Sequence, residues 1–298
     1  MSIFSQFLKR SSPQQGIVLY YIVAIVIAFL LLNLPYVHKP GVEVNPIDTL
    51  FVAVSGISVT GLSPISIVDT YSTFGQLIIL VILNIGGIGV MAIGTMLWVV
   101  LGKHIGIRER QLIMLDNNKN TMSGTVKLII DIVKSIFVIE LVGAMLLAFY
   151  FYRDNPDLKY AIMQGVFVSI SATTNGGLDI TGKSLIPYAH DYFVQAIVIF
   201  LIILGSIGFP VLLEVKAYIQ NRVTNFSFSL FTKITTSTYL FLFIVGVLAI
   251  LLFEHNHAFK GLSWHQSLFY SLFQSATTRS AGLQTIDVTT LSDPTNII

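Results

Sequence analysis

Three segments of the chain end alike in Gly-Leu: Ser58-Val59-Thr60-Gly61-Leu62, Thr174-Asn175-Gly176-Gly177-Leu178 and Arg279-Ser280-Ala281-Gly282-Leu283. Each of these Gly-Leu loops follows a short apolar stretch that carries serine and threonine, at 46–57, 160–172 and 264–276. The combination recurs about every 110 residues, which indicates an internally repeated structure. The nature of the repeat depends on the solvent in which the chain folds.

The composition shows that this solvent is a lipid bilayer. Of the 298 residues, 54% are apolar or aromatic and 11% are charged, against about 25% charged in soluble domains. This excludes a water-soluble globular fold. The net charge of +2 is too small and too evenly mixed for a nucleic-acid-binding protein. The sequence has no cysteine, so it carries no disulfide or thiol nucleophile, and we expect no metal site beyond the transported ion.

Five apolar runs are long enough to cross about 30 Å of hydrocarbon as helices: 16–34, 74–101, 126–152, 192–215 and 234–253. The three short stretches are too short to cross and predict re-entrant half-helices. The sequence therefore predicts an all-α membrane protein of parallel repeats, each with a span, a pore half-helix and a second span, around a central pore. It has five spans and three re-entrant loops. Close helix packing is predicted at Gly86, Gly87, Gly89 and Gly94, and a bend in the fourth span is predicted at Gly205, Gly208 and Pro210.

The distribution of basic residues predicts an N-terminus in the cytoplasm. With this orientation ten lysines and arginines lie in the cytoplasmic segments and six in the outer ones. All three Gly-Leu loops then open on the outer side, where ten acidic residues face those six basic ones. Such an excess concentrates cations in an outer vestibule, although an ordinary solvated surface explains it equally well.

The Gly-Leu loops are the candidate ion-binding site. Non-helical backbone at membrane depth is tolerated where it lines a water-filled cavity or is buried in protein. Glycine there allows carbonyl oxygens to turn toward the axis and replace the hydration shell of a monovalent cation. The negative C-terminal end of each half-helix favours the same charge. The predicted ion-binding residues are Val59, Thr60, Gly61, Asn175, Gly176, Gly177, Ser280, Ala281 and Gly282. A single Gly-Leu is more simply an ordinary turn, but three copies at matched positions favour the pore.

Two charged residues near these loops need an explanation. Arg279 directly precedes Ser280, where a positive charge facing the ion would repel it, so we expect Arg279 to face away and support the filter. Glu140 lies deep in the third span without a local partner. A charge at this depth costs roughly 2.5–3.5 kcal/mol on insertion scales. A buried structural hydrogen bond and a link to the pore-loop region explain it equally well.

The three loops resemble the filter segments of the Trk/Ktr/HKT potassium transporters, most of all Ala276-Thr277-Thr278-Arg279-Ser280-Ala281-Gly282-Leu283. The second helices of the first two repeats also resemble this family, at Asn84-Ile85-Gly86-Gly87-Ile88-Gly89 and at Gly205-Ser206-Ile207-Gly208-Phe209-Pro210. The whole chain is similar to the Ktr-type membrane subunit. The resemblance implies K⁺ uptake through one pore lined by four non-identical repeats, with Gly61, Gly177 and Gly282 as three of the filter glycines. It also implies a homodimer on a cytosolic ring of nucleotide-binding (RCK-type) regulatory subunits, a bacterial plasma membrane, and an influence of Na⁺.

The predicted organisation is a cytoplasmic N-terminus (1–15), repeat 1 (16–101), a cytoplasmic linker (102–125), repeat 2 (126–215), a second linker (216–233) and an incomplete repeat 3 (234–298). The second helix of repeat 3, with the family's gating loop, and all of repeat 4 are missing from the pattern. We therefore expect a truncated chain, a broken reading frame or an incomplete gene product.

Other functions remain as alternatives. A secondary transporter of another solute would also have broken helices, but it usually adds a polar substrate cluster, which the sequence lacks. A non-conducting fragment is a further alternative. An intramembrane enzyme has no support, because paired aspartates, Gly-x-Ser-x-Gly and His-Glu-x-x-His are all absent.

Overall fold

The computed structural model describes residues 13–100, 111, 124–221 and 226–297, and within these ranges every regular element is helical. The first repeat contains α2 (Pro13–Leu32), α3 (Pro46–Ser58), the short α4 (Ile67–Thr70), α5 (Thr73–Ile88) and α6 (Val90–Val100). The second contains α8 (Thr125–Asp154), α9 (Leu158–Thr173), η1 (Ile186–Tyr188), α10 (Tyr192–Ser206) and α11 (Phe209–Asn221). The third contains α12 (Leu230–Glu254), α13 (Trp264–Thr277), η2 (Val288–Thr290) and α14 (Asp293–Ile297). The predicted N-terminus 1–15 and linker 102–125 lie almost wholly outside the described residues.

The three predicted half-helices are confirmed as α3, α9 and α13, and each begins at a polar side chain. Asn45 accepts a hydrogen bond from the N–H of Ile47 at 3.1 Å, just before α3. Asp157 accepts from Lys159 and Tyr160 at the start of α9, at 3.0 and 3.2 Å. In α13 the side chain of Gln266 reaches back to the N–H of Ser263 at 3.0 Å. These caps satisfy N–H groups that lack a partner within the helix. The starting point of each half-helix is thus encoded locally.

Two of the five predicted spans are bent pairs of helices. The described residues contain three straight helices long and apolar enough to cross a membrane, α2, α8 and α12, and two bent pairs that raise the number to five if each pair is one span. The axes of α5 and α6 differ by 104°, and those of α10 and α11 by 106°. Gly89 and Gly208, at the two breaks, have φ angles of 100° and 97°, which a right-handed helix cannot contain. The bend of the fourth span was expected; that of the second was not.

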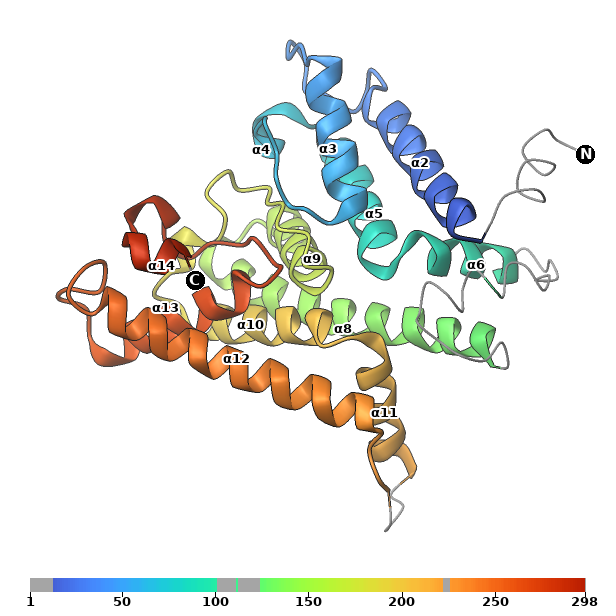
Figure 1. Ribbon diagram of the computed structural model, residues 1–298. Helices are drawn as coiled ribbons and strands as arrows, with labels where there is room; N and C mark the ends of the chain where they lie inside the picture. Colours follow the sequence, from blue (N-terminus) through green and yellow to red (C-terminus); the bar gives the residue numbers. More distant parts are fainter. Residues whose placement is uncertain (1–12, 101–110, 112–123, 222–225, 298) are drawn as a thin grey trace, which may run out of the picture.

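The half-helices form the centre of the packing. Figure 1 shows α9 between the α2–α3–α5 group of the first repeat and the α12–α13 group of the third. Phe167 of α9 is fully buried in the core of the first repeat, and Val168, its neighbour, is buried in a core that also includes Phe273 of α13. Outward side chains such as Leu252 (76% exposed) and Phe149 (76% exposed) are large and apolar. This arrangement suits a protein whose outer surface contacts lipid.

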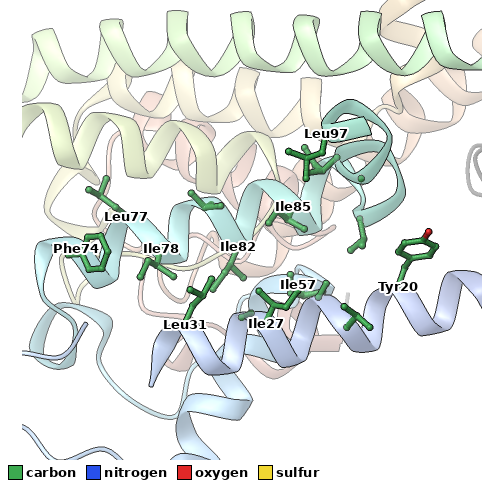
Figure 2. A pocket seen from close by; sticks show the side chains of 17 residues that line it. Tyr20, Ile27, Leu31, Ile57, Phe74, Leu77, Ile78, Ile82, Ile85 and Leu97 are labelled. Carbon is green, nitrogen blue, oxygen red and sulfur yellow. The ribbon is translucent and has the colours of Figure 1, made fainter. Parts of the chain in front are cut away.

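Both complete pairs of spans enclose an apolar hollow. In the first repeat a cavity of about 400 Å³ lies between α2 and the bent pair α5–α6, and Figure 2 shows Ile27 and Leu31 facing Ile78 and Ile82 across it. In the second repeat a cavity of about 440 Å³ lies between α8 and α10, lined by apolar side chains such as Leu146 and Phe200. The two hollows occupy corresponding places, which agrees with the predicted repetition.

Candidate functional site

The three Gly-Leu loops meet in space. A Cβ atom built on Gly61 would lie 3.1 Å from the Cα of Gly177, and one built on Gly177 would lie 3.3 Å from the Cα of Gly282. The Cβ position on Gly61 is also 2.9 Å from the carbonyl oxygen of Gly176, and the Cβ position on Gly177 is 2.8 Å from that of Ala281. The loops therefore contact one another in the order of the repeats, and a side chain larger than hydrogen does not fit between them.

The backbone at the meeting point is left-handed. Gly61, Gly177 and Gly282 have φ angles of 79°, 64° and 72°. Val59 and Asn175 also have positive φ angles, 55° and 57°. For a β-branched residue such as Val59 this conformation is a genuine outlier, and strain of this kind concentrates at functional sites. The third loop differs from the first two in its backbone, because neither Ser280 nor Ala281 has a positive φ angle.

A common hydrogen bond closes each half-helix onto its loop. The N–H groups of Thr60, Gly176 and Gly282 each donate to the carbonyl oxygen five residues earlier, at 2.9, 2.8 and 3.3 Å. In the first two loops a left-handed residue, Val59 or Asn175, precedes the donor, which gives the 6→1 form typical of helix C-termini. In the third loop the residue before the donor, Ala281, is not left-handed. The loops are thus direct continuations of the half-helix ends, where the helix dipoles place partial negative charge.

The half-helix hydroxyl groups fix two of the loops from behind. Ser171 donates to the carbonyl oxygen of Leu178 at 2.7 Å, and Thr277 donates to that of Leu283 at 2.6 Å. Both donors are buried. The buried hydroxyl of Ser55 in the first half-helix has no partner among the described residues. The sequence marked these hydroxyl residues as a shared feature, but their bonds across the loops could be seen only once the loops were folded back.

The predicted close packing is confirmed at Gly86 and Gly87 and is wrong at Gly94, whose Cβ position has no atom within 4 Å, while Gly89 lies at the break between α5 and α6. A Cβ on Gly86 would lie 2.5 Å from the carbonyl oxygen of Gly56 and 2.6 Å from that of Ile57, at the end of α3. A Cβ on Gly87 would collide with Thr174, directly before the second loop. The end of α5 therefore lies against the ends of two half-helices. Gly205 of α10 is placed in the same way, against Thr173 and Asn175.

A polar cavity of about 470 Å³ opens on the three loop glycines. Its wall includes the carboxylates of Asp179 and Asp287 and the amine of Lys183. The hydroxyl and N–H groups of Thr289 lower the pKa of Asp287 by hydrogen bonding, so this carboxyl group stays ionised at neutral pH. This wall thus contains two acidic residues and one basic residue, a small excess of the kind expected for the vestibule.

The family follows from comparison with known proteins. The profile of the TrkH family, described as cation transport protein, matches residues 4–298. The chain belongs to the TrkH family. It is 50% identical over 292 residues to Ktr system potassium uptake protein D of Bacillus subtilis, with 98% of this chain and 65% of that protein covered. It is 32% identical over 288 residues to potassium/sodium uptake protein NtpJ of Enterococcus hirae, with 95% of this chain and 62% of that protein covered.

A solved structure shows the same fold. The crystal structure of the potassium transporter TrkH from Vibrio parahaemolyticus superposes with a TM-score of 0.62 at 16% identity, over 93% of this chain and 53% of that one. The all-helical membrane transporter fold predicted from the sequence is thereby confirmed, and the relatives named above are transport proteins and not enzymes. The chain spans about two thirds of the length of the curated relatives it matches.

In this TrkH-family chain Arg279 is directed toward α12. Its Nε atom donates to the carbonyl oxygen of Ser275 in α13 at 3.2 Å, and its guanidinium carbon lies 5.3 Å from the ring centroid of Tyr239. The bond is to the half-helix and not to a loop carbonyl. Arg279 thereby connects the last turn of α13 to α12.

Glu140 is a buried polar residue of this TrkH-family chain that contacts two other helices. With its amide nitrogen turned toward α8, Asn84 of α5 donates to both carboxylate oxygens of Glu140, at 2.9 and 3.2 Å. The main-chain carbonyl of Glu140 accepts a hydrogen bond from the hydroxyl group of Ser169 in α9, at 2.8 Å. Of the two interpretations left open by the sequence, the buried structural hydrogen bond is present, whereas the link to the pore-loop region stays a prediction.

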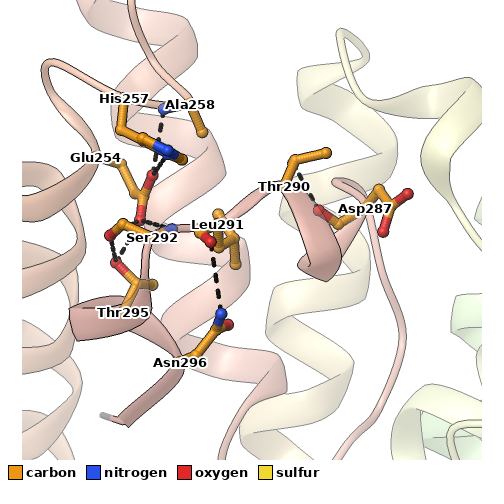
Figure 3. Close-up of polar contacts among 9 residues, drawn as sticks. All are labelled: Glu254, His257, Ala258, Asp287, Thr290, Leu291, Ser292, Thr295 and Asn296. Carbon is orange, nitrogen blue, oxygen red and sulfur yellow. Dashed lines mark hydrogen bonds and ion pairs between the residues drawn. The ribbon is translucent and has the colours of Figure 1, made fainter.

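Glu254, at the end of α12, anchors the segment that follows the third loop. Its carboxylate is fully buried and accepts hydrogen bonds from the N–H and hydroxyl groups of Ser292, at 2.9 and 2.6 Å, and from the hydroxyl group of Thr295. The N–H of Ala258 and the ring of His257 complete the contacts at 3.2 Å, as Figure 3 shows. This role was not predicted, because the partners of Glu254 lie 38 and 41 residues away in the sequence.

Proposed function

We propose that this chain forms the ion-translocating part of a K⁺ uptake protein. The ion passes along the side of the touching Gly-Leu loops that faces the pore, where carbonyl oxygens replace its water. The residues are Val59, Thr60, Gly61, Asn175, Gly176, Gly177, Ser280, Ala281 and Gly282. The single observation that carries the proposal is the direct contact of the three loop glycines at the ends of three half-helices, beneath a polar cavity. Uncharged carbonyl ligands and helix C-termini suit a monovalent cation that must also leave quickly.

The names of the relatives support K⁺ as the ion and bring Na⁺ into consideration. The Bacillus relative is a potassium uptake protein, and the Enterococcus relative is named for both potassium and sodium. We expect Na⁺ to influence transport here too. The plasma membrane as location, the cytoplasmic N-terminus, the homodimer and the cytosolic nucleotide-binding partner belong to the same proposal and rest on the resemblance and on the basic residues of the cytoplasmic segments.

Uptake of Rb⁺, as a tracer for K⁺, tests the proposal in cells that lack their own K⁺ uptake. Two proteins are compared: the chain as printed, and the chain joined to the C-terminal third of the Bacillus relative, which supplies a fourth loop. We expect saturable Rb⁺ uptake at sub-millimolar concentration from the joined protein. If neither protein transports Rb⁺ despite its presence in the membrane and co-expression of the relative's regulatory subunit, the K⁺ assignment fails and a secondary transporter of another solute becomes the better account.

A further inference from the structure

Glu140 lies where a carboxylate is costly and yet has several hydrogen-bonded contacts. It is 5% exposed and sits midway along α8, the longest span. At the centre of a bilayer a carboxylate costs roughly 2.5–3.5 kcal/mol, and such residues face the protein interior and usually have a function. Within the described ranges no basic side chain forms an ion pair with it. Its partner is the neutral amide of Asn84.

The contacts of Glu140 connect three elements that meet at the loops. Through its carboxylate it holds Asn84 on α5, and through its main-chain carbonyl it holds Ser169 on α9. One turn further along α8, a Cβ on Gly143 would lie 2.5 Å from the Ser169 hydroxyl, so the two helices touch at this point. Glu140 therefore contacts α5 through its side chain and α9 through its main chain.

The residues of α5 that follow Asn84 contact the ends of two half-helices, directly beside the loops. Gly86 lies against the carbonyl oxygens of Gly56 and Ile57 at the end of α3, and Gly87 lies against Thr174 at the end of α9. A displacement of α5 along α8 would thus move the first two loops relative to each other. A bidentate contact to a carboxylate restrains such movement better than apolar packing, which is not directional.

We propose that Glu140 is a positioning residue for ion selection: its carboxylate holds Asn84, while its main-chain carbonyl is bonded to Ser169, so that the side chain fixes the end of α5 against both half-helices and keeps the first two loops in register. The effect on selectivity rests on the proposed function, whereas the effect on the position of α5 does not. The hydrogen bonds, and not the charge, carry the role, since glutamine at this position can still pair with the Asn84 amide.

Disulfide trapping measures the position directly, because the chain has no cysteine of its own. The Cβ position on Gly56 lies 3.8 Å from the Cβ of Ile82, a distance that suits a disulfide, so Gly56→Cys with Ile82→Cys reports the contact of α3 with α5. Gly246→Cys with Ser275→Cys, whose Cβ positions are 3.4 Å apart, reports the distant contact of α12 with α13. Cross-linking rates are compared in membranes for the joined protein and for its Glu140→Leu, Glu140→Gln, Asn84→Ala and Asp131→Asn forms, together with Rb⁺ uptake in competition with Na⁺.

We expect Glu140→Leu and Asn84→Ala to slow the 56–82 cross-link by about fivefold or more and to weaken discrimination against Na⁺. Glu140→Gln and the same-helix control Asp131→Asn should match the parent in both measurements, and the 246–275 cross-link should not change. Asn84→Ala carries the test if Glu140→Leu does not reach the membrane. Unchanged 56–82 cross-linking in both breaking variants, or a Glu140→Gln variant as impaired as Glu140→Leu, would overturn the proposal. If the parent takes up no Rb⁺, the proposed function fails, while the cross-links still decide whether Glu140 positions α5.

Discussion

The hydroxyl group of Thr277 donates a hydrogen bond to the carbonyl oxygen of Leu283, at 2.6 Å, and thereby spans the whole third Gly-Leu loop. Ser171 and Leu178 make the same connection in the second repeat. Each bond joins the last turn of a half-helix to the residue after the loop glycine, so it fixes both ends of the segment that would face the ion.

Removal of this hydroxyl group should destabilise the protein. Thr277→Val keeps the shape of the side chain but leaves a buried carbonyl without its partner, at a cost of about 1–3 kcal/mol. We expect a lower midpoint of thermal unfolding in detergent and weaker K⁺ over Na⁺ discrimination. Thr278→Val is the matched control, because the Thr278 hydroxyl bonds within its own helix to Gln274. Equal effects of the two variants would contradict the special role of the bond across the loop.

Two glycines of the second span should respond in opposite ways to alanine. Gly87 lies against Thr174, so Gly87→Ala overpacks the contact between α5 and α9 and should cost about 1–3 kcal/mol. Gly94 has no atom within 4 Å of its Cβ position, so Gly94→Ala should be neutral or stabilising by about 0.5–1 kcal/mol. Thermal unfolding of the two variants, measured side by side, checks the prediction. A Gly94→Ala variant as unstable as Gly87→Ala would contradict the difference in packing between the two glycines.

Loss of the Glu254 carboxylate should release the segment after the third loop. Glu254→Ala removes the acceptor shared by Ser292, Thr295 and Ala258, and we expect faster proteolysis between residues 284 and 297. Limited proteolysis followed by mass spectrometry locates the cleavage. His257→Ala is the control, because it removes one partner whose side chain is 56% exposed, and it should be cleaved slowly. Equal cleavage rates in Glu254→Ala and the parent would argue against the anchor.

The sequence predicted the parts of this structure that depend on local patterns. The apolar lengths predicted the half-helices α3, α9 and α13, and polar caps at Asn45, Asp157 and Ser263 start them locally. The contact of the loop glycines was expected from their repetition and was then found in space. Their role as ion ligands stays a prediction.

Other features depend on contacts between distant segments and could not be predicted. The break at Gly89 was missed because Gly86, Gly87 and Gly89 all look alike within an apolar run, while only Gly89 takes a φ angle of 100°. The partners of Glu140 lie 56 residues before it and 29 residues after it, so only the folded chain shows them. The same holds for the connection of Glu254 with Ser292.

We propose that the left-handed glycines of the Gly-Leu loops select K⁺, and the variant Gly177→Ser changes one of these glycines. Serine at a φ angle of 64° is strained by about 1–2 kcal/mol, and its Cβ would lie 2.8 Å from the carbonyl oxygen of Ala281. Gly261→Ser is the matched control, since Gly261 also has a positive φ angle, 88°, but open space around it.

The measurement is the ratio of K⁺ to Na⁺ affinity, from competition against Rb⁺ uptake by the joined protein. We expect Gly177→Ser to lower this ratio by about tenfold and Gly261→Ser to leave it unchanged. An unchanged ratio in a Gly177→Ser variant that still transports would contradict the claim that these glycines form the selective site.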